Sequence, residues 1–572
     1  MAVDINIMVG GEAGQGVQAA GFIIAKALGR YGLSVFADQD YESRVRGGHN
    51  FFRIRASDGD VGAISEEVDV LLALDRQSID LHQREVSSDG VIIFDSDRME
   101  GVGANERALG LPLERMALET AKNKQAANLV AVGAAMSLLG YDSASLKSVV
   151  LDYFGALQIG QADADAAARG YEDAKASSRR GLGKQVGPAG AQKRMLLNGN
   201  EAVALGAMAA GCKFVSAYPM TPSTTIMEYM AGKADELGVV VVQPEDEISA
   251  INMIIGASYA GVRSMTATSG GGFCLMVEGL GLAGMTETPV VVVDGQRAGP
   301  AIGLPTRTEQ GDLLFALHAS HGDFPRVVLA PANVEDAFWL TVKAFNLADE
   351  YQVPVIILTD QYLASSYATA ERFDLSRVQI KRGQLFSEQD PSKSERYKRY
   401  EITASGISPR AFPLQSTALV VADSDEHNEE GHLIEDAETR TAMMLKRQRK
   451  LEGLKKEISG PRTHGPSHAD ITLIGWGSTL GALRETVDTA PQHGPSVNLV
   501  HFAEIWPFPS EAATLALKGA RRTFAVENNA TAQFAQLLRA ETGHQVSGTI
   551  LKFDGRPLTP AYVMENLKKE VA

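Results

Sequence analysis

A predicted strand that begins at residue 213 is followed by a turn rich in hydroxyl groups and then by a helix. The strand-like run ends at two prolines, which cannot continue a central strand, and Thr221, Ser223 and Thr224 stand next to them. Any of these three could cap the apolar-periodic helix that follows. An acidic turn that ends in Glu247 starts another helix further on. Strand ends of this kind bind ligands in open α/β sheets, although a proline-rich turn and an acidic helix start explain the same residues without a ligand.

Glycine and arginine near the N-terminus could bind an anion. A glycine-rich turn at residues 10–16 joins the predicted strand 5–9 to a helix from Val17 to Leu28. Backbone N–H groups in such a turn can cradle phosphate or carboxylate, but the spacing is not that of a dinucleotide-binding fold, and a tight connection is the simpler explanation. Arg44 and Arg46 could also bind an anionic ligand, or pair with local carboxylates.

Cysteine and histidine are too sparse to indicate a metal site. The chain has two cysteines, Cys212 and Cys274, whereas an iron–sulfur cluster usually takes four thiolates and a zinc site needs close spacing. We therefore expect both to be small buried side chains. His318 and His321 lie one helical turn apart without a third ligand, so we expect a structural role for them. If this protein transfers electrons, another chain must carry the metal.

Length and charge indicate how many domains to expect and which partners to exclude. A chain of 572 residues should form several domains, because single cores stop growing at about 250–300 residues. A net charge of −16 would repel a phosphate backbone, so we do not expect nucleic acid as a partner. The sequence has neither an apolar run of about 18 residues nor the pattern of a signal peptide. We therefore expect no membrane span and a cytoplasmic location.

Apolar strands alternate with helices over most of the chain, which predicts an α/β fold with parallel strands. We predict three α/β domains, at residues 1–190, 194–372 and 469–572. Residues 373–468 are polar and include a charged helix from 440 to 457. This composition predicts an irregular insertion that wraps the surface or contacts a partner.

Taken together, the N-terminal glycine-rich turn, the proline-containing turn and the Glu247 helix resemble the alpha subunit of 2-oxoacid:ferredoxin oxidoreductases, with the gamma domain of that family fused at its N-terminus. The likeness covers nearly the whole chain, and Met220 replaces the isoleucine that is usual in the family. The resemblance implies that the predicted domains are, in order, the gamma domain, a pyrimidine-binding thiamine-dependent domain and a transketolase C-terminal-like domain. Its strongest parts are Tyr218-Pro-Met-Thr-Pro-Ser-Thr224, the Glu247 helix, Gly295-Gln-Arg-Ala-Gly-Pro300 and Gly303-Leu-Pro-Thr-Arg-Thr-Glu-Gln-Gly-Asp312.

The resemblance implies the chemistry of that family. Its enzymes decarboxylate a 2-oxoacid on thiamine diphosphate, pass electrons to ferredoxin through iron–sulfur clusters and give the acyl group to coenzyme A. For this chain the resemblance implies 2-oxoglutarate as the substrate and succinyl-CoA and CO₂ as products, in a reversible step of the tricarboxylic acid cycle.

A beta subunit is implied as the partner. The resemblance implies that it holds the diphosphate with Mg²⁺ and a [4Fe-4S] cluster. This chain agrees with that division, since it has neither the metal-binding motif nor the cluster cysteines. The two chains would form an (αβ)₂ assembly that reduces ferredoxin, and this chain alone would be inactive. We assign no metal ligand to this chain.

The resemblance also assigns roles to individual residues. Glu247 would contact the aminopyrimidine ring and tune its amine, which is acid–base work, whereas Glu245 and Asp246 would only complement the helix dipole. Thr221 would bind the 2-oxoacid, and Arg297 would bind its 1-carboxylate, for which a planar guanidinium is suited.

Further positions follow from the same resemblance. Arg307, with Thr306 and Thr308, would bind the distal carboxylate of a dicarboxylic substrate; a loop arginine that faces solvent is the alternative. The glycines at 270–272 would let the backbone approach the reacting centre, unless they form a flexible turn. Two sets complete the prediction: Ser43, Arg44 and Arg46 for the phosphates of coenzyme A, and Tyr218, Pro219, Thr268, Ser269 and Gly270 for the cofactor.

Three alternatives stay open at this point. Within the same family, pyruvate or a branched-chain 2-oxoacid could be the substrate. The glycine-rich turn would also suit a non-catalytic, electron-transfer flavoprotein-like subunit, which would carry flavin. A thiamine enzyme of the non-oxidative kind would need no iron–sulfur partner.

Overall fold

The structure is a computed structural model, and the chain in it divides into two compact units. Unit 1 spans Met1–Leu197 with the short segments Ser365–Arg372 and Thr559–Tyr562, and unit 2 takes the rest of the chain. Among the described residues, no helix combines the length and the apolar character needed to cross a membrane. The structure describes residues 3–42, 47–102, 107–155, 157–177, 182–187, 194–386, 397–414, 418–490 and 494–571.

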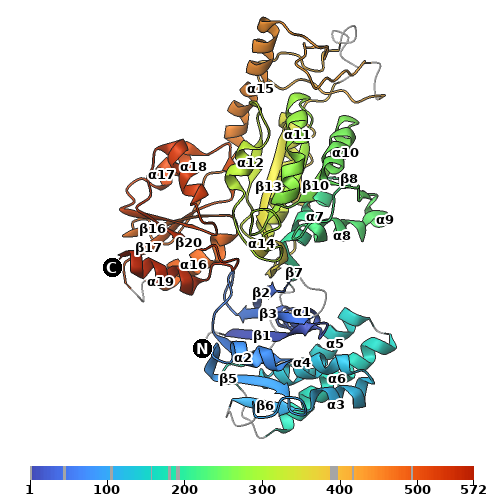
Figure 1. The fold of residues 1–572 in the computed structure, drawn as a ribbon, viewed down its shortest axis with the longest axis vertical. Coiled ribbons are helices and arrows are strands. Elements are labelled where there is room, and N and C mark those ends of the chain that lie inside the picture. The colour runs from blue at the N-terminus through green and yellow to red at the C-terminus, as the bar shows by residue number, and fades with distance from the viewer. Residues whose placement is uncertain are drawn as a thin grey trace. The chain divides into compact units, whose positions relative to one another are not determined.

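Unit 1 is built on a mixed sheet of eight strands (Figure 1). The predicted first strand and helix are confirmed as β1 and α1 (Val17–Arg30), but β3 runs antiparallel to both β1 and β2. Residues from far along the chain complete the sheet, because β14 pairs with β2. In sheet order the strands are β6 (Ala108–Leu111), β5 (Val86–Asp95), β4 (Val68–Ala73), β1 (Asp4–Ala13), β3 (Gly47–Ser57), β2 (Ser34–Asp40), β14 (Tyr367–Ala370) and β7 (Met195–Asn198).

Two helices of unit 1 pack unusually closely. A Cβ atom on Gly133 in α4 (Ala127–Leu138) would lie 1.9 Å from the carbonyl oxygen of Ala167 in α6 (Gln158–Ala176). A Cβ on Gly170 of α6 would lie 2.0 Å from the carbonyl oxygen of Val130. Glycine on both helices therefore lets the two backbones touch, which buries α4 in the core of the unit.

Unit 2 contains a seven-stranded sheet, as the predicted α/β fold with parallel strands requires (Figure 1). All neighbouring pairs from β9 to β12 are parallel, and β18 adds an antiparallel edge. Because parallel strands end at the same edge, the segments that follow β8, β10 and β11 meet there. In sheet order the strands are β18 (Glu504–Trp506), β12 (Val327–Leu329), β13 (Pro354–Asp360), β11 (Val290–Gln296), β10 (Ser264–Thr268), β8 (Phe214–Ser216) and β9 (Val240–Val242).

Helices pack on both faces of this sheet. One face, which includes Val290 and Val292, packs against α10, α11 and α12. The connecting helices are α7 (Gly199–Ala209), α8 (Thr224–Ala231), α10 (Glu247–Tyr259), α11 (Gly270–Met285), α12 (Leu313–His318) and α13 (Val334–Tyr351).

The last part of unit 2 forms a five-stranded sheet of its own. Its aromatic side chains, such as Trp476 and Phe502, lie in the same hydrophobic core as Val292 of the larger sheet. The two sheets of unit 2 therefore share one core. In sheet order the strands are β15 (Arg462–His464), β17 (Val497–Phe502), β16 (Ile471–Trp476), β19 (Arg522–Glu527) and β20 (Gly548–Leu551), and the helices are α16 (Leu480–Thr489), α17 (Ser510–Ala516), α18 (Gln533–Thr542) and α19 (Pro560–Val571).

The charged helix predicted at 440–457 exists as α15 (Ala437–Glu457), but one of its faces is buried rather than solvated. Lys446 and Lys450 are 0% and 1% exposed, and their Nζ atoms lie 2.6 and 2.5 Å from the two carboxylate oxygens of Glu287. Burial alone would raise the pKa of Glu287, yet the two ammonium groups hold it below its ordinary value. The prediction of an irregular insertion that wraps the surface or contacts a partner did not include this buried face, which forms because a single buried carboxylate binds two cations of α15.

Replacing Glu287 by glutamine should destabilise unit 2 strongly. Two ammonium groups would stay buried without a counter-charge, which typically costs about 3–5 kcal/mol. Urea denaturation followed by circular dichroism measures the change in the free energy of unfolding. The control is Arg169→Ala, which breaks an exposed pair with Asp173 and should cost less than about 1 kcal/mol. Equal small losses in both variants would contradict a structural role for the Glu287 cluster.

Candidate active site

The turn after β8 and the end of β11 are in direct contact. Nη1 of Arg297 donates a hydrogen bond to the carbonyl oxygen of Thr221, at 2.7 Å. A Cβ atom on Gly295 would lie 3.0 Å from Pro222, so glycine allows this close approach. Nδ2 of Asn200, at the start of α7, donates to the carbonyl oxygen of Pro222 at 2.7 Å and holds the turn from the other side. Two of the predicted substrate residues are thus brought together.

The hydroxyl groups of the turn do not cap α8, contrary to the sequence-based expectation. The helix begins at Thr224, and its N-cap residue, Ser223, makes no capping hydrogen bond through its side chain. Oγ of Ser223 instead donates to the carbonyl oxygen of Thr268, 2.6 Å away. The hydroxyl that could have capped a helix therefore joins the turn to the end of β10, because a buried carbonyl oxygen there needs a donor.

The two acidic residues at the start of α10 have different surroundings. Asp246 caps the helix by accepting a hydrogen bond from the backbone N–H of Ser249, at 2.7 Å, as the simpler interpretation predicted. Glu247 is only 3% exposed, and its Oε1 has no hydrogen-bonding partner within the described residues. A buried carboxylate oxygen without a partner is energetically costly, so Glu247 has the properties of a ligand-binding residue.

The glycines at 270–272 form the first turn of α11 rather than a flexible loop. A Cβ atom on Gly272 would lie 2.6 Å from Oε1 of Glu247 and 2.1 Å from Oγ1 of Thr268. Only glycine can therefore bring this helix so close to the carboxylate. Oγ of Ser269, which precedes the helix, is also buried and lacks a partner in the described part of the chain.

Two acids near this turn, one fully buried and one half-buried, were missed at the level of sequence. Asp294 is completely buried in β11, and Asp312 stands immediately before α12. Burial, followed by repulsion from Asp312, raises the pKa of Asp294 well above its ordinary value. Burial also raises the pKa of Asp312 to about 6, against the opposing charge of Arg297. An aspartate within a run of valines was the available signal, since charged residues are rarely fully buried.

Arg307 lies in the loop between β11 and α12, and its backbone pairs with the residue that follows Arg297. Its carbonyl oxygen accepts a hydrogen bond from the backbone N–H of Ala298, at 3.2 Å. Its side chain is half-buried, and its Cβ lies 3.0 Å from where a Cβ of Gly555 would be. Thr306 is buried beside it. The role of both residues in substrate binding stays a prediction.

The other predicted positions differ in exposure. Tyr218 is 38% exposed and Pro219 is half-buried, so the edge of the turn is open. Of the two cysteines, Cys212 is buried as expected, but Cys274 is exposed on α11, so that expectation was wrong for it. Its position follows from helical geometry, which turns it away from the core side of α11. The predicted coenzyme A contacts, Ser43, Arg44 and Arg46, lie outside the described residues.

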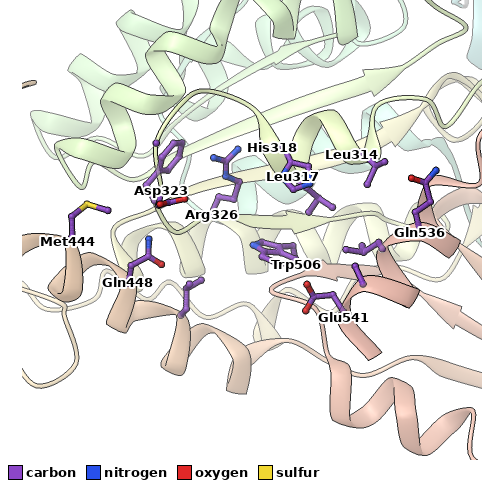
Figure 2. A pocket seen from close by; sticks show the side chains of 15 residues that line it. Leu314, Leu317, His318, Asp323, Arg326, Met444, Gln448, Trp506, Gln536 and Glu541 are labelled. Carbon is purple, nitrogen blue, oxygen red and sulfur yellow. The ribbon is translucent and has the colours of Figure 1, made fainter. Parts of the chain in front are cut away.

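A cavity of about 700 Å³ opens elsewhere in unit 2, between α12, α15 and α18 (Figure 2). Arg326, Trp506 and Leu317 line it, and none of the predicted site residues does. Nη1 of Arg326 donates to the carbonyl oxygen of Ala319, at 2.5 Å, at the end of α12. This arginine therefore stabilises the C-terminal end of α12. The cavity is separate from the edge of the sheet where Glu247 and Arg297 lie.

Three family models match the chain in succession. The model described as "Pyruvate ferredoxin/flavodoxin oxidoreductase" matches residues 6–173. The model described as "Pyruvate flavodoxin/ferredoxin oxidoreductase, thiamine diP-bdg" matches residues 205–446, a range that includes Glu247, Arg297 and the glycines at 270–272. The model described as "Pyruvate:ferredoxin oxidoreductase core domain II" matches residues 469–563.

Known proteins are similar over nearly the whole chain. The alpha subunit of 2-oxoacid:ferredoxin oxidoreductase 2 from Aeropyrum pernix is 33% identical, over 97% of this chain and 96% of its own. The 2-oxoacid:ferredoxin oxidoreductase subunit alpha of a Sulfolobus species is 33% identical, over 99% and 97%. The 2-oxoglutarate synthase subunit KorA of Methanothermobacter marburgensis is 34% identical, over 65% of this chain and 97% of its own.

A solved structure agrees with the whole fold. It is 2-oxoglutarate:ferredoxin oxidoreductase from Magnetococcus marinus, with 2-oxoglutarate, coenzyme A and succinyl-CoA bound. The likeness has a TM-score of 0.91 at 33% identity and covers 100% of both chains. This chain therefore belongs to the 2-oxoacid:ferredoxin oxidoreductase family, as an alpha subunit with a fused N-terminal gamma domain.

Proposed function

We propose that this chain is the alpha subunit of an enzyme that oxidatively decarboxylates 2-oxoglutarate to succinyl-CoA and CO₂ and reduces ferredoxin. The observation that carries the proposal is the buried, unpartnered Oε1 of Glu247 at the sheet edge where Arg297 contacts Thr221. The substrate choice is supported by relatives named 2-oxoglutarate synthase and by the 2-oxoglutarate in the Magnetococcus marinus structure. Family membership leaves no support for the flavoprotein-like alternative.

The residues around Glu247 fit the pyrimidine ring of thiamine diphosphate. When bound, this cofactor supplies a nucleophilic carbon and an electron sink for decarboxylation. Oε1 of Glu247 would share a proton with a ring nitrogen and thereby gain the partner that it lacks within the described residues. Gly272, next to that oxygen, keeps the space clear of a side chain. The buried position of Glu247 would keep water away from this proton.

Arg297 and Arg307 would divide the recognition of a dicarboxylic oxoacid between them. Arg297 donates to the carbonyl oxygen of Thr221, which fixes its guanidinium beside the hydroxyl-bearing turn. A guanidinium in that position would bind the 1-carboxylate, which all 2-oxoacids share, while the Thr221 hydroxyl would bind the adjacent carbonyl. Arg307 in the same loop would bind the second carboxylate, which pyruvate lacks.

Exposed apolar side chains on the helices of the site support a protein partner. Ile248 and Met253 of α10 are 50% and 42% exposed, and Leu275 of α11 is 49% exposed. Apolar side chains gathered on neighbouring helices commonly mark an interface. We assign this surface to a beta subunit that brings the diphosphate, Mg²⁺ and a [4Fe-4S] cluster in an (αβ)₂ assembly. Without it the chain would be inactive. The cytoplasmic location and the role in the tricarboxylic acid cycle stay predictions.

Replacing Glu247 by glutamine should lower turnover of 2-oxoglutarate by at least about 100-fold, because proton transfer by a positioned carboxylate would be lost. Reduction of a viologen by the complex with its partner, in the presence of coenzyme A, measures the rate. Asp246→Asn is the matched control, since asparagine also caps helices and turnover should be unchanged. Full activity of the Glu247 variant would refute its assigned role.

Replacing Arg307 by alanine should separate the two substrate classes. Loss of a hydrogen bond to a charged group should reduce kcat/KM for 2-oxoglutarate by about 10- to 100-fold and leave pyruvate turnover unchanged. Arg297→Ala is the companion variant and should impair both substrates, because both carry the 1-carboxylate. An equal loss for both substrates in the Arg307 variant would remove its role in selection.

Replacing Leu275 by aspartate should prevent assembly with the beta subunit, because a charge would be buried at the interface. Co-purification of the two chains, with circular dichroism of the variant alone, measures this. Leu515 of α17 is 71% exposed and provides the control, since Leu515→Asp should leave assembly intact. Normal assembly of the Leu275 variant would place the partner on another surface.

A further inference from the structure

Gln310, at the base of the loop that carries Arg307, is bound by the five-stranded sheet through each of its polar groups. It is 0% exposed, and its backbone N–H donates to the carbonyl oxygen of Asn528, at 2.7 Å. Its Oε1 accepts from the backbone N–H of Asn528 at 3.1 Å, and its Nε2 donates to the carbonyl oxygen of Trp476, also at 3.1 Å. Its carbonyl oxygen accepts from Nδ2 of Asn529, at 3.1 Å. Four hydrogen bonds thus tie the base of the loop to the ends of β16 and β19.

The side chain of Asn528 binds a second segment, which follows β20. Its Nδ2 donates to the carbonyl oxygen of Lys552 at 2.5 Å and to that of Arg556 at 3.4 Å. Asn528 is 4% exposed, so these bonds are shielded from water. One asparagine therefore joins the base of the loop, through its backbone, to the turn at residues 552–556, through its side chain.

That turn packs against the side chain of Arg307. A Cβ atom on Gly555 would lie 3.0 Å from the Cβ of Arg307, 3.3 Å from its Cγ and 3.2 Å from Cδ1 of Leu304. Any side chain at this position would therefore push the stem of the arginine away. Gly555 also has a φ of +75°, which favours glycine. The turn thus forms a wall beside Arg307, and the absence of a side chain on Gly555 sets how close that wall is.

The tip of the loop, in contrast, is open to solvent. Ile302 and Leu304 are 66% and 50% exposed. Backbone hydrogen bonds of Ala298 with Leu304 and Arg307, at 2.9 and 3.2 Å, give the loop its shape. Because these bonds lie within the loop, they do not fix its position against the rest of unit 2. That position depends on the base of the loop, where Gln310 is attached.

We propose that Asn528 and Gln310 are positioning residues for the selection of a dicarboxylic substrate. They place Arg307 against Gly555, so the five-stranded sheet sets the distance at which a second carboxylate is bound. This inference rests on the proposed function of Arg307. A displaced guanidinium loses the geometry of its hydrogen bonds with a carboxylate. Displacement should therefore weaken binding of the second carboxylate and spare the 1-carboxylate, which Arg297 would bind.

Replacing Asn528 by alanine removes both side-chain bonds to the 552–556 turn and keeps the backbone bonds to Gln310. In the complex with its partner, KM for 2-oxoglutarate should rise about 10-fold, with little change in kcat or in pyruvate turnover. Asn498→Ala is the matched control, because Nδ2 of Asn498 in β17 also donates to a backbone carbonyl, that of Pro466, at 3.0 Å. It should leave both substrates unaffected. Equal losses for the two substrates in Asn528→Ala would overturn the proposal.

Gly555→Ala tests the contact with Arg307 without removing a side-chain hydrogen bond. The new Cβ should displace the arginine and raise KM for 2-oxoglutarate by about 3- to 10-fold, while pyruvate turnover stays the same. Gly543→Ala controls for backbone strain, since Gly543 has the same φ of +75° and a Cβ there would meet nothing within 4 Å. An unchanged KM for 2-oxoglutarate in Gly555→Ala would show that the wall does not position Arg307.

Hydrogen–deuterium exchange of the complex without substrate separates this inference from the proposed function. Asn528→Ala should speed the exchange of backbone amides in residues 304–311, because the base of the loop is held less firmly, and Asn498→Ala should not. Unchanged exchange in Asn528→Ala would refute the positioning role, whatever the substrate is. Failure of the unmodified complex to turn over 2-oxoglutarate would refute the proposed substrate, while the exchange result would stand.

Discussion

Burial of carboxyl groups beneath the first turn of α11 is the constraint on which the site depends. Gly270 and Gly272 let this turn approach Asp312 and Glu247 so closely that a Cβ on either would lie within 2.6 Å of a carboxylate oxygen. One carboxylate oxygen of each acid is thereby removed from water without a hydrogen-bonding partner in the described chain. In such surroundings a carboxyl group binds a proton or a ligand far more strongly than it would at the surface.

The parallel sheet of unit 2 supplies the second condition. Because β8, β10 and β11 end at one edge, segments that are separated in sequence by 45 or 76 residues make direct contacts there. Arg297 reaches the backbone of Thr221, and Ser223 reaches that of Thr268. These contacts fix the turn from two sides, which is the rigidity that a site for small acids requires. The helices that cover this edge still expose Ile248 and Leu275, as expected of a surface completed by another chain.

Two fully buried carboxyl groups of unit 2 have pKa values that are shifted in opposite directions. Glu287 is paired with two lysines of α15, and its pKa stays low, whereas Asp294 lacks a partner and its pKa is raised. Both acids are fully buried, so the difference arises from the neighbouring charges and not from burial itself. A buried carboxyl group therefore anchors a helix at one place, whereas at the other its neutral form is favoured.

Periodicity and turn chemistry in the sequence determined the α/β class, because these are local signals of hydrophobic spacing, proline and glycine. The resemblance to a known family, and not these patterns, implied the roles of Glu247 and Arg297. Tertiary structure alone decided which of these residues are buried and what they contact. Ser223 donates a hydrogen bond to the end of β10 instead of capping α8, Cys274 is exposed, and one face of α15 is buried. None of this could be predicted from a local pattern, since burial and electrostatic coupling depend on which distant segments pack together.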